Sequence, residues 1–301
     1  MCKFAHENGI DLSLSRQKHR RIESIELVRA ERKDNRADLA FHSRPFVLCG
    51  LPIRRPPASM LQYTRRNGRF KLDILAHPDF GLPFGQDRLV PIWVATRAVR
   101  QKSRTVLFHS AAEILDDFGL PKDGPHYRRL VDGFKRIFAS SVYFGTEESG
   151  VTRKTVWDYR RFHFFDRLRL WCDPGADTMC EPAGSDTNVI CLSEAFWQEI
   201  QAHPIPASAI VVRALTGNPG CLDFYVWLSW RCFHAKRAER VPLFGSGGLV
   251  NQLGVMEYSR ERNFRKRLKE WLKLVRLYWP ACPARLDEEG GSLIVEPSPG
   301  I

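Results

Sequence analysis

The chain has 301 residues, of which 44% are hydrophobic and 11% aromatic, and this apolar content excludes a chain that is disordered throughout. Lys and Arg number 46 against 34 Asp and Glu, a net charge of +12, which favours a polyanionic partner such as nucleic acid or acidic lipid. No stretch approaches the ~20 apolar residues needed to span a bilayer, and the N-terminus lacks a signal-peptide core, so we expect a cytoplasmic protein with no membrane partner.

The eight cysteines are spread thinly and form neither a Cys-x-x-Cys pair nor a Cys/His cluster with zinc-finger spacing. Several stand in apolar helical patterns, such as Cys232 beside Phe233. We therefore expect reduced, mostly buried thiols and no bound metal ion.

Residues 1–58 are predicted to form a basic N-terminal arm that is partly disordered, because the segment is polar and ends near a stiff connector, Arg54-Arg55-Pro56-Pro57. Within this arm, the stretch Arg20–Arg32 brings Ile22 and Val28 near one face. That pattern fits a helix and a frayed basic arm equally well.

Residues 59–172 are predicted to form a first winged-helix-like domain. Turn residues, helix caps and apolar periodicity place its elements in chain order: a hairpin over Gln62–Leu75 that turns at Gly68, a loop at Gly81–Gly85, a helix over Arg88–Arg100, a strand at Thr105–Phe108, a short helix capped by Ser110, a helix over Tyr127–Ala139, a strand at Ser141–Thr146, a turn at Glu147–Gly150 and one or two strands over Val151–Trp171. From Arg88 onward, this is the element order of a winged helix.

Residues 173–186 are rich in Pro, Gly and Asp and are predicted to be an exposed loop. Residues 187–301 are predicted to form a second winged-helix domain. Its elements are a strand at Asn188–Leu192, a helix over Glu194–Gln201, a helix from Ala207 to Leu215, a strongly apolar central helix over Leu222–Ala235, a strand at Val241–Phe244, helices over Ser246–Leu253 and Ser259–Tyr278, and a hairpin from Arg285 to Glu296. The predicted fold class is α+β, with tandem winged-helix domains behind a basic N-terminal arm.

The segment Ser259–Tyr278 is the most informative, because its apolar and basic residues segregate onto opposite faces of one helix. Its basic residues are Arg260, Arg262, Arg265, Lys266, Arg267, Lys269, Lys273 and Arg276, against only two acidic residues. The second helix of a helix-turn-helix enters the major groove with its N-terminus first, where such side chains reach guanine edges and phosphates. We therefore predict that this helix contacts DNA; the alternative is the solvated face of an ordinary amphipathic helix.

Three further basic groups are weaker candidates for DNA contact. At the recognition position of the first domain, the helix Tyr127–Ala139 carries Arg128, Arg129, Lys135 and Arg136. The end of the helix Arg88–Arg100 offers Arg97, Arg100, Lys102 and Arg104, although cations there also suit the helix dipole. The later strands form either a wing along the phosphate backbone or the polar side of a half-exposed sheet, and they carry Arg153-Lys154, Arg160-Arg161, Arg167 and Arg169.

Signatures of catalysis are missing from the sequence. There is no Gly-x-x-x-x-Gly-Lys-Ser/Thr loop, which argues against a P-loop ATPase. There is also no His-x-His pair with a nearby tyrosine, which a metal-dependent nicking enzyme needs. We therefore expect no catalytic residue, no cofactor and no metal, and a DNA strand-transfer enzyme is the least favoured class.

One group of motifs within residues 51–142 carries a family likeness: Tyr63–Gly68, Gly81–Gly85, Arg88-Leu89, Thr96–Arg104 and Glu113–Leu120. The most specific part is Ala98-Val-Arg-x-Lys-Ser-Arg104 behind the Gly-Leu-Pro-aromatic-Gly loop. On these motifs the chain resembles the plasmid-encoded RepA replication-protein family. The resemblance implies a plasmid replication initiator in a bacterial cytoplasm.

The leading hypothesis is therefore that tandem winged helices bind sequence-specific sites in double-stranded plasmid origin DNA, strain the duplex and recruit the host initiator and replicative helicase. The alternative is a winged-helix transcriptional repressor that uses the same helices without opening the DNA. The sequence leaves monomer and homodimer both open.

Overall fold

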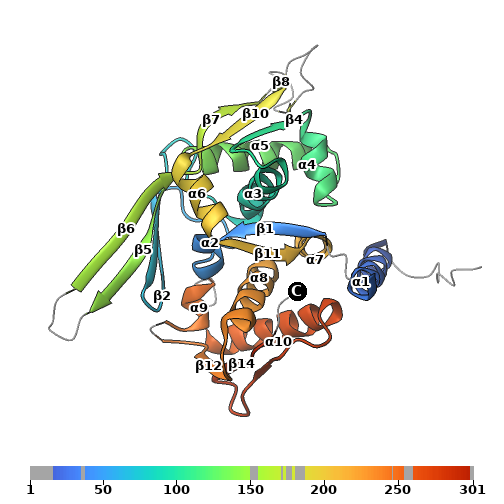
Figure 1. Cartoon of the computed structure of the whole chain (residues 1–301), viewed down its shortest axis with the longest axis vertical. Coiled ribbons are helices and arrows are strands. Elements are labelled where there is room, and N and C mark those ends of the chain that lie inside the picture. Colours follow the sequence, from blue (N-terminus) through green and yellow to red (C-terminus); the bar gives the residue numbers. More distant parts are fainter. Residues whose placement is uncertain are drawn as a thin grey trace, which may run out of the picture.

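The computed structural model describes residues 16–34, 38–149, 155–170, 172–173, 178–179, 187–245, 247–253 and 260–298 (Figure 1). One continuous cluster of buried apolar side chains extends from Val28 to Val295. A two-stranded ribbon crosses the middle of the molecule, with one helix-and-strand unit above it, a second below it, and a long-stranded sheet to one side (Figure 1).

The central ribbon consists of β1 (Leu39–Ser43) and β11 (Pro204–Ser208), which pair antiparallel from Leu39 with Ser208 to Ser43 with Pro204. Helix α2 (Arg44–Leu48) follows β1 directly and buries all of its residues from Pro45 to Leu48. The stretch that forms β1 and α2 was predicted to belong to the basic arm at 1–58, and no strand was predicted at 204–208. The reason is that each strand is short and finds its partner at a large sequence separation, which local patterns do not reveal.

Helix α1 (Arg16–Asp34) confirms the helical alternative for the stretch around Arg20–Arg32. It contacts α7 (Ala209–Leu215) and α10 (Glu261–Tyr278), and its Val28 is buried in the common core. The earlier part of the predicted arm, residues 1–15, lies outside the described residues.

The long-stranded sheet has the order β2-β3-β5-β6, formed by β2 (Gln62–Asn67), β3 (Phe70–Leu75), β5 (Ser141–Ser149) and β6 (Thr155–His163). The predicted hairpin at Gly68 is confirmed, since Asn67 pairs with Phe70 and Gly68 has a φ of +57°, which glycine adopts without strain. Strand β5 continues to Ser149 through the predicted turn at Glu147–Gly150, because residues 147–149 still pair with β6.

The N-terminal unit contains the 3₁₀ turn η1 (Gly85–Arg88), α3 (Leu89–Gln101), β4 (Thr105–Phe108), α4 (Ala111–Asp117), α5 (Gly124–Phe138), β7 (Phe165–Arg169) and β10 (Asn188–Leu192). Its sheet has the order β4-β10-β7, so the last strand lies between the other two. The predicted capping box of Ser110 and Glu113 begins α4. Beyond β7, the short strands β8 (Cys172–Asp173) and β9 (Thr178–Met179) pair with each other.

The C-terminal unit contains α8 (Pro219–His234), β12 (Glu239–Pro242), α9 (Leu249–Gln252), α10, β13 (Ala284–Leu286) and β14 (Ser292–Val295). Its sheet has the order β12-β14-β13, which again places the last strand in the middle. Helix α8 is buried along most of its length, as its nearly uniform apolarity predicted. Both units therefore share one series, helix–strand–helix–helix–strand–strand, with the same strand order, although in the N-terminal unit β5 and β6 of the long-stranded sheet intervene between α5 and β7, and the short pair β8–β9 between β7 and β10.

The strand pairing does not agree with the domain boundary that was predicted at residue 187. Strand β10 was predicted to open the second domain, but it pairs with β4 and β7 of the N-terminal unit. Helix α6 (Glu194–Ala202), which follows β10, contacts β6, α3 and the central ribbon. The hairpin that closes the N-terminal unit is therefore β7–β10, and the predicted exposed loop at 173–186 falls between its strands; residues 174–177 and 180–186 of that loop lie outside the described part of the chain.

A buried ion pair joins the two units. Arg88, at the end of η1, is 2% exposed and pairs with Asp223 of α8, whose side chain is 5% exposed. The same guanidinium donates hydrogen bonds to the carbonyl oxygens of Gly85, Leu51 and Pro52. All these acceptors are buried together with Arg88. Arg88 therefore holds the segment that leads into α3 against α8, the central helix of the other unit.

Buried His42 gives the fold a specific acid sensitivity. This β1 residue is 4% exposed, and burial together with nearby Arg88 lowers its pKa to about 3. In the unfolded chain a histidine takes up a proton near pH 6.5, whereas folded His42 stays neutral. The folded state is therefore fully favoured above pH 6.5 and is progressively destabilised as the pH falls toward 3.

We expect this histidine alone to remove about 2 kcal/mol from the free energy of unfolding between pH 7 and pH 5. Urea denaturation of the parent and of His42→Gln at both pH values measures the effect, and the parent should lose more stability than the variant. Equal losses in the two proteins would show that His42 is not held neutral by the fold.

Candidate nucleic-acid interface

Helix α10 has one face that is fixed by packing. Its buried residues are Phe264, Leu268, Trp271, Leu272, Val275 and Tyr278. The Trp271 ring lies so close to the start of α8 that a Cβ atom on Gly220 would stand 2.4 Å from it. This contact fixes the rotation of α10 about its own axis and so decides which side chains face outward.

The outward face of α10 carries a stripe of cations. Arg262, Lys266, Lys269 and Lys273 follow one another at intervals of four, three and four residues, so they share one face of the helix. All four are exposed. Among the residues that the structure describes, none of the four has an acidic partner within ion-pair distance, and neither has exposed Arg260 at the N-cap. We call these four residues the α10 stripe.

The other cations of α10 are engaged within the protein. Arg265 pairs with Glu261, donates to the Gly290 carbonyl oxygen at 2.9 Å and stacks over Phe244. Arg267 pairs with Glu270, and Arg276 donates to the carbonyl oxygen of Ala284. All these bases look alike in the sequence. Glu270 stands three residues from Arg267 but also four from Lys266 and three from Lys273, so spacing alone does not separate the paired arginines from the stripe; the side-chain geometry does.

Helix α5 occupies the matching position in the N-terminal unit, but it presents fewer free cations. Asp123 caps the helix by accepting a hydrogen bond from the His126 amide. The hydrogen bond with the His126 side chain, followed by this backbone one, lowers the pKa of the Asp123 carboxyl. Exposed Arg128 and Lys135 have no acidic partner in the described chain, yet exposed Asp132 lies within one turn of both. The net charge of that face is therefore small.

Arg136 of α5 is engaged in an ion pair within the protein and is not free to contact DNA. It forms a two-pronged ion pair with Asp87 of η1, at 2.6 and 2.9 Å, and stacks over Phe84. Burial opposes its charge, but the Asp87 carboxylate outweighs burial and raises the pKa of Arg136. Because a nucleic acid would have to break this pair, we do not carry Arg136 into the proposed interface.

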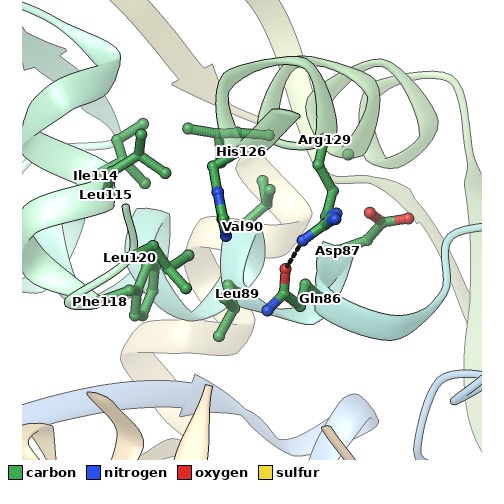
Figure 2. A pocket seen from close by; sticks show the side chains of 12 residues that line it. Gln86, Asp87, Leu89, Val90, Ile114, Leu115, Phe118, Leu120, His126 and Arg129 are labelled. Carbon is green, nitrogen blue, oxygen red and sulfur yellow. Dashed lines mark hydrogen bonds between the residues drawn. The ribbon is translucent and has the colours of Figure 1, made fainter. Parts of the chain in front are cut away.

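A small apolar pit beneath α5 shows how that helix is positioned (Figure 2). Leu89 and Val90 of α3 meet side chains of α4 and the loop after it, while Arg129 donates to the Gln86 side chain at 3.2 Å at the rim. The pit has a volume of about 20 Å³, which suits a water molecule rather than a cofactor. It is a packing seam that holds α3, α4 and α5 together.

The basic cluster at the end of α3 is largely neutralised by acids from distant segments. Arg100 pairs with Asp38 at 2.6 Å, while Arg97 pairs with Asp117 at 2.9 Å. Arg104 pairs with Glu194 and Asp166, and its hydrogen bond to Glu194 is the largest cause of its raised pKa. Lys102 remains exposed, in the left-handed conformation that ends the helix.

The arginines of the later strands are divided between two sheets. Arg160 and Arg161 lie on β6, whereas Arg167 and Arg169 lie on β7 beside β10. They therefore do not form one continuous wing, and Arg153 and Lys154 fall outside the described residues. In the C-terminal unit, the tip between β13 and β14 carries exposed Glu288 and Glu289, which repel phosphates.

Within the described ranges, no three His, Cys, Asp or Glu residues are placed to hold a metal ion. Nor does that part of the chain contain a helix both long and apolar enough to cross a membrane. Cys49, Cys221, Cys232 and Cys282 are buried free thiols, and burial raises the pKa of each.

Comparison with known proteins adds a family and a fold. A family model described as "Plasmid encoded RepA protein" matches residues 82–242, just over half of the chain. No curated protein matches it. A crystal structure of RctB domains 2–3 is similar with a TM-score of 0.52 and 12% identity, covering 83% of this chain and 94% of that one. A second structure of RctB domains 2 and 3 covers 74% and 80%, with a TM-score of 0.46 and 13% identity. The first likeness shows a shared mixed α+β fold.

Proposed function

The chain belongs to the family of plasmid-encoded RepA proteins, and from this premise we propose that it starts plasmid replication by binding double-stranded origin DNA, with α10 as the principal recognition helix. The observation that carries this proposal is the α10 stripe: four exposed cations without acidic partners, on the face opposite the buried one. Such residues lose no internal interaction when they meet phosphates or base edges.

We interpret both units as winged helices, because each has the helix–strand–helix–helix–strand–strand series with the last strand in the middle of its sheet, interrupted in the N-terminal unit by β5–β6 and β8–β9. In that arrangement the helix before the hairpin, α5 or α10, enters the major groove. Because α10 has more cations without acidic partners in the described chain than α5 has, we take α10 as the principal recognition helix. Arg128, Lys135 and Lys102 add contacts to the DNA backbone. Recruitment of the host initiator and replicative helicase is part of the same proposal, and membership of the family supports it.

A plasmid maintenance assay tests the proposal against the repressor alternative. Plasmid replication should stop when the coding frame is interrupted and resume when the chain is supplied in trans. A variant lacking the α10 stripe should fail to restore it. Normal maintenance without the chain, with only its own promoter derepressed, would instead identify a repressor.

Salt dependence gives a direct measure of the phosphate contacts. If roughly 6–10 phosphates are neutralised, affinity for origin DNA should fall by about 10³–10⁵ between 50 and 200 mM salt. A mobility-shift titration at several salt concentrations measures the slope. A flat response would exclude a binding mode dominated by cations.

The purified protein should leave supercoiled plasmid unnicked with Mg²⁺ or Mn²⁺, because its proposed action is to bind and strain the duplex. Agarose gel analysis, followed by denaturing electrophoresis for protein–DNA adducts, checks this expectation. A covalent adduct would place the protein among strand-transfer enzymes.

A further inference from the structure

A basic groove lies apart from α5 and α10, between the long-stranded sheet and α6. It has a volume of about 760 Å³. Strands β3, β5 and β6 form one wall, and Ala195 and exposed Gln198 of α6 stand on the other side. Figure 1 shows the β5–β6 hairpin extending away from the body of the molecule, with α6 beside its inner end.

The charges in this groove favour an anion. Four arginines line it, Arg44, Arg69, Arg160 and Arg161, against the two acids Asp158 and Glu199. Glu199 is already held by Arg44 at 3.1 Å. Arg160 and Arg161 are exposed and have no acidic partner within ion-pair distance in the described chain. The groove therefore has a net positive charge. Arg160 lies opposite Phe144 in the β5–β6 pairing and so projects from the groove face of the sheet, whereas Arg161 lies opposite Tyr143 and projects from the other face.

An aromatic stack forms the floor between these arginines. Phe70 and Phe144 lie parallel, with ring centroids 5.8 Å apart and planes 3° apart. Arg69 lies over the Phe70 ring at 5.3 Å, and Arg44 over the Phe144 ring at 5.7 Å. Phe144 is buried, whereas Phe70 is only half-buried and offers part of its ring to the groove.

We propose that this groove is a second nucleic-acid site, which binds a short stretch of single-stranded DNA. Phosphates contact Arg160, and an unpaired base packs against Phe70 and the guanidinium plane of Arg69. Arginine and aromatic surfaces in a positively charged groove are the chemistry that holds single strands without sequence preference.

The same features argue against a duplex and against an acidic peptide. Bases in a duplex are already stacked on both faces, so none is available to the Phe70 ring, whereas an unpaired base exposes a face. An acidic peptide would satisfy the arginines but would leave the aromatic stack without a planar partner. The proposal is independent of α10, because no α10 residue lines the groove.

Binding of a fluorescein-labelled oligothymidine of about 16 nucleotides to the full chain tests the proposal by fluorescence anisotropy. Arg160→Ala/Arg161→Ala should weaken this binding by about ten-fold or more, and Phe70→Leu by about five-fold. The matched control is Lys18→Ala/Arg20→Ala, which removes the same charge from exposed positions on α1 and should change binding by less than about two-fold. Thermal melts of all variants verify that they fold.

Duplex origin DNA is measured on the same variants, so the two sites can fail separately. The groove variants should retain duplex binding, while Arg262→Ala/Lys266→Ala should lose duplex binding and keep the oligothymidine. The proposal is overturned if the parent does not bind the strand, or if the folded groove variants bind it like the parent. It is also overturned if Lys18→Ala/Arg20→Ala or Arg262→Ala/Lys266→Ala weakens oligothymidine binding as much as the groove variants do. A further contrary result would be that polyglutamate displaces the labelled strand as effectively as unlabelled oligothymidine does.

Discussion

Replacing Arg88 with leucine should lower the free energy of unfolding by about 3–5 kcal/mol, because it leaves the Asp223 carboxylate buried without its partner. Both side chains are almost fully buried, and Arg88 also binds three backbone carbonyl oxygens of the segments around it. Urea denaturation measures the loss. The double variant Arg88→Leu/Asp223→Leu should recover part of it, since the unpaired buried charge is then gone.

Arg285→Leu is the control for this prediction. Arg285 pairs with Glu296, but their side chains are 57% and 40% exposed, and an ion pair so open to water contributes less than about 1 kcal/mol. If Arg88→Leu is as mild as Arg285→Leu, then the buried pair does not hold the two units together.

Removing charges from the α10 stripe should abolish recognition without unfolding the protein. We expect Arg262→Ala and Lys266→Ala each to weaken binding to origin DNA by about 1–3 kcal/mol. A side chain that reads a base edge should lose specificity at one position, whereas one that contacts a phosphate should lose affinity on every sequence with a shallower salt slope. Both side chains are exposed, so the melting temperature should stay near that of the parent.

Two comparisons make the stripe prediction specific. Trp271→Ala, on the buried face of the same helix, should destabilise the fold by about 3–5 kcal/mol through a cavity against Phe224 and Phe264. Arg160→Ala/Arg161→Ala removes the same charge as Arg262→Ala/Lys266→Ala but should leave duplex binding intact. Binding isotherms beside thermal melts separate these cases. Parent-like binding by both stripe variants would make α10 a solvated surface and leave α5 to carry recognition.

Much of the secondary structure was predictable, because its signals are local. Strands β4 and β10 begin and end where the sequence predicted. The capping box at Ser110 and the glycine turn at Gly68 act through neighbours within a few residues. Helix α10 follows from apolar periodicity, which depends only on the period of the helix, and α8 follows from a long, nearly uniformly apolar segment.

Strand partners were not predictable, because pairing is decided by segments far apart in the chain. The predicted strand Asn188–Leu192 is correct as an element, but its partners β4 and β7 place it in the preceding unit. Strands β1 and β11 carry no strong local pattern, and only their mutual pairing in the core makes them strands. A short strand acquires most of its stability from its neighbours.

The sequence by itself determined most of the elements, the positive charge, the family likeness and the segregation of basic from apolar residues on α10, since these depend on composition and on spacing within one segment. Only the tertiary structure decided which cations are free. Arg100, Arg104 and Arg136 belong to clusters that look basic in sequence, yet each meets a carboxylate from another segment, Asp38, Glu194 or Asp87. The stripe Arg262, Lys266, Lys269 and Lys273 meets none in the described chain. An ion pair depends on distance in space, and folding brings together acids and bases that the sequence keeps far apart.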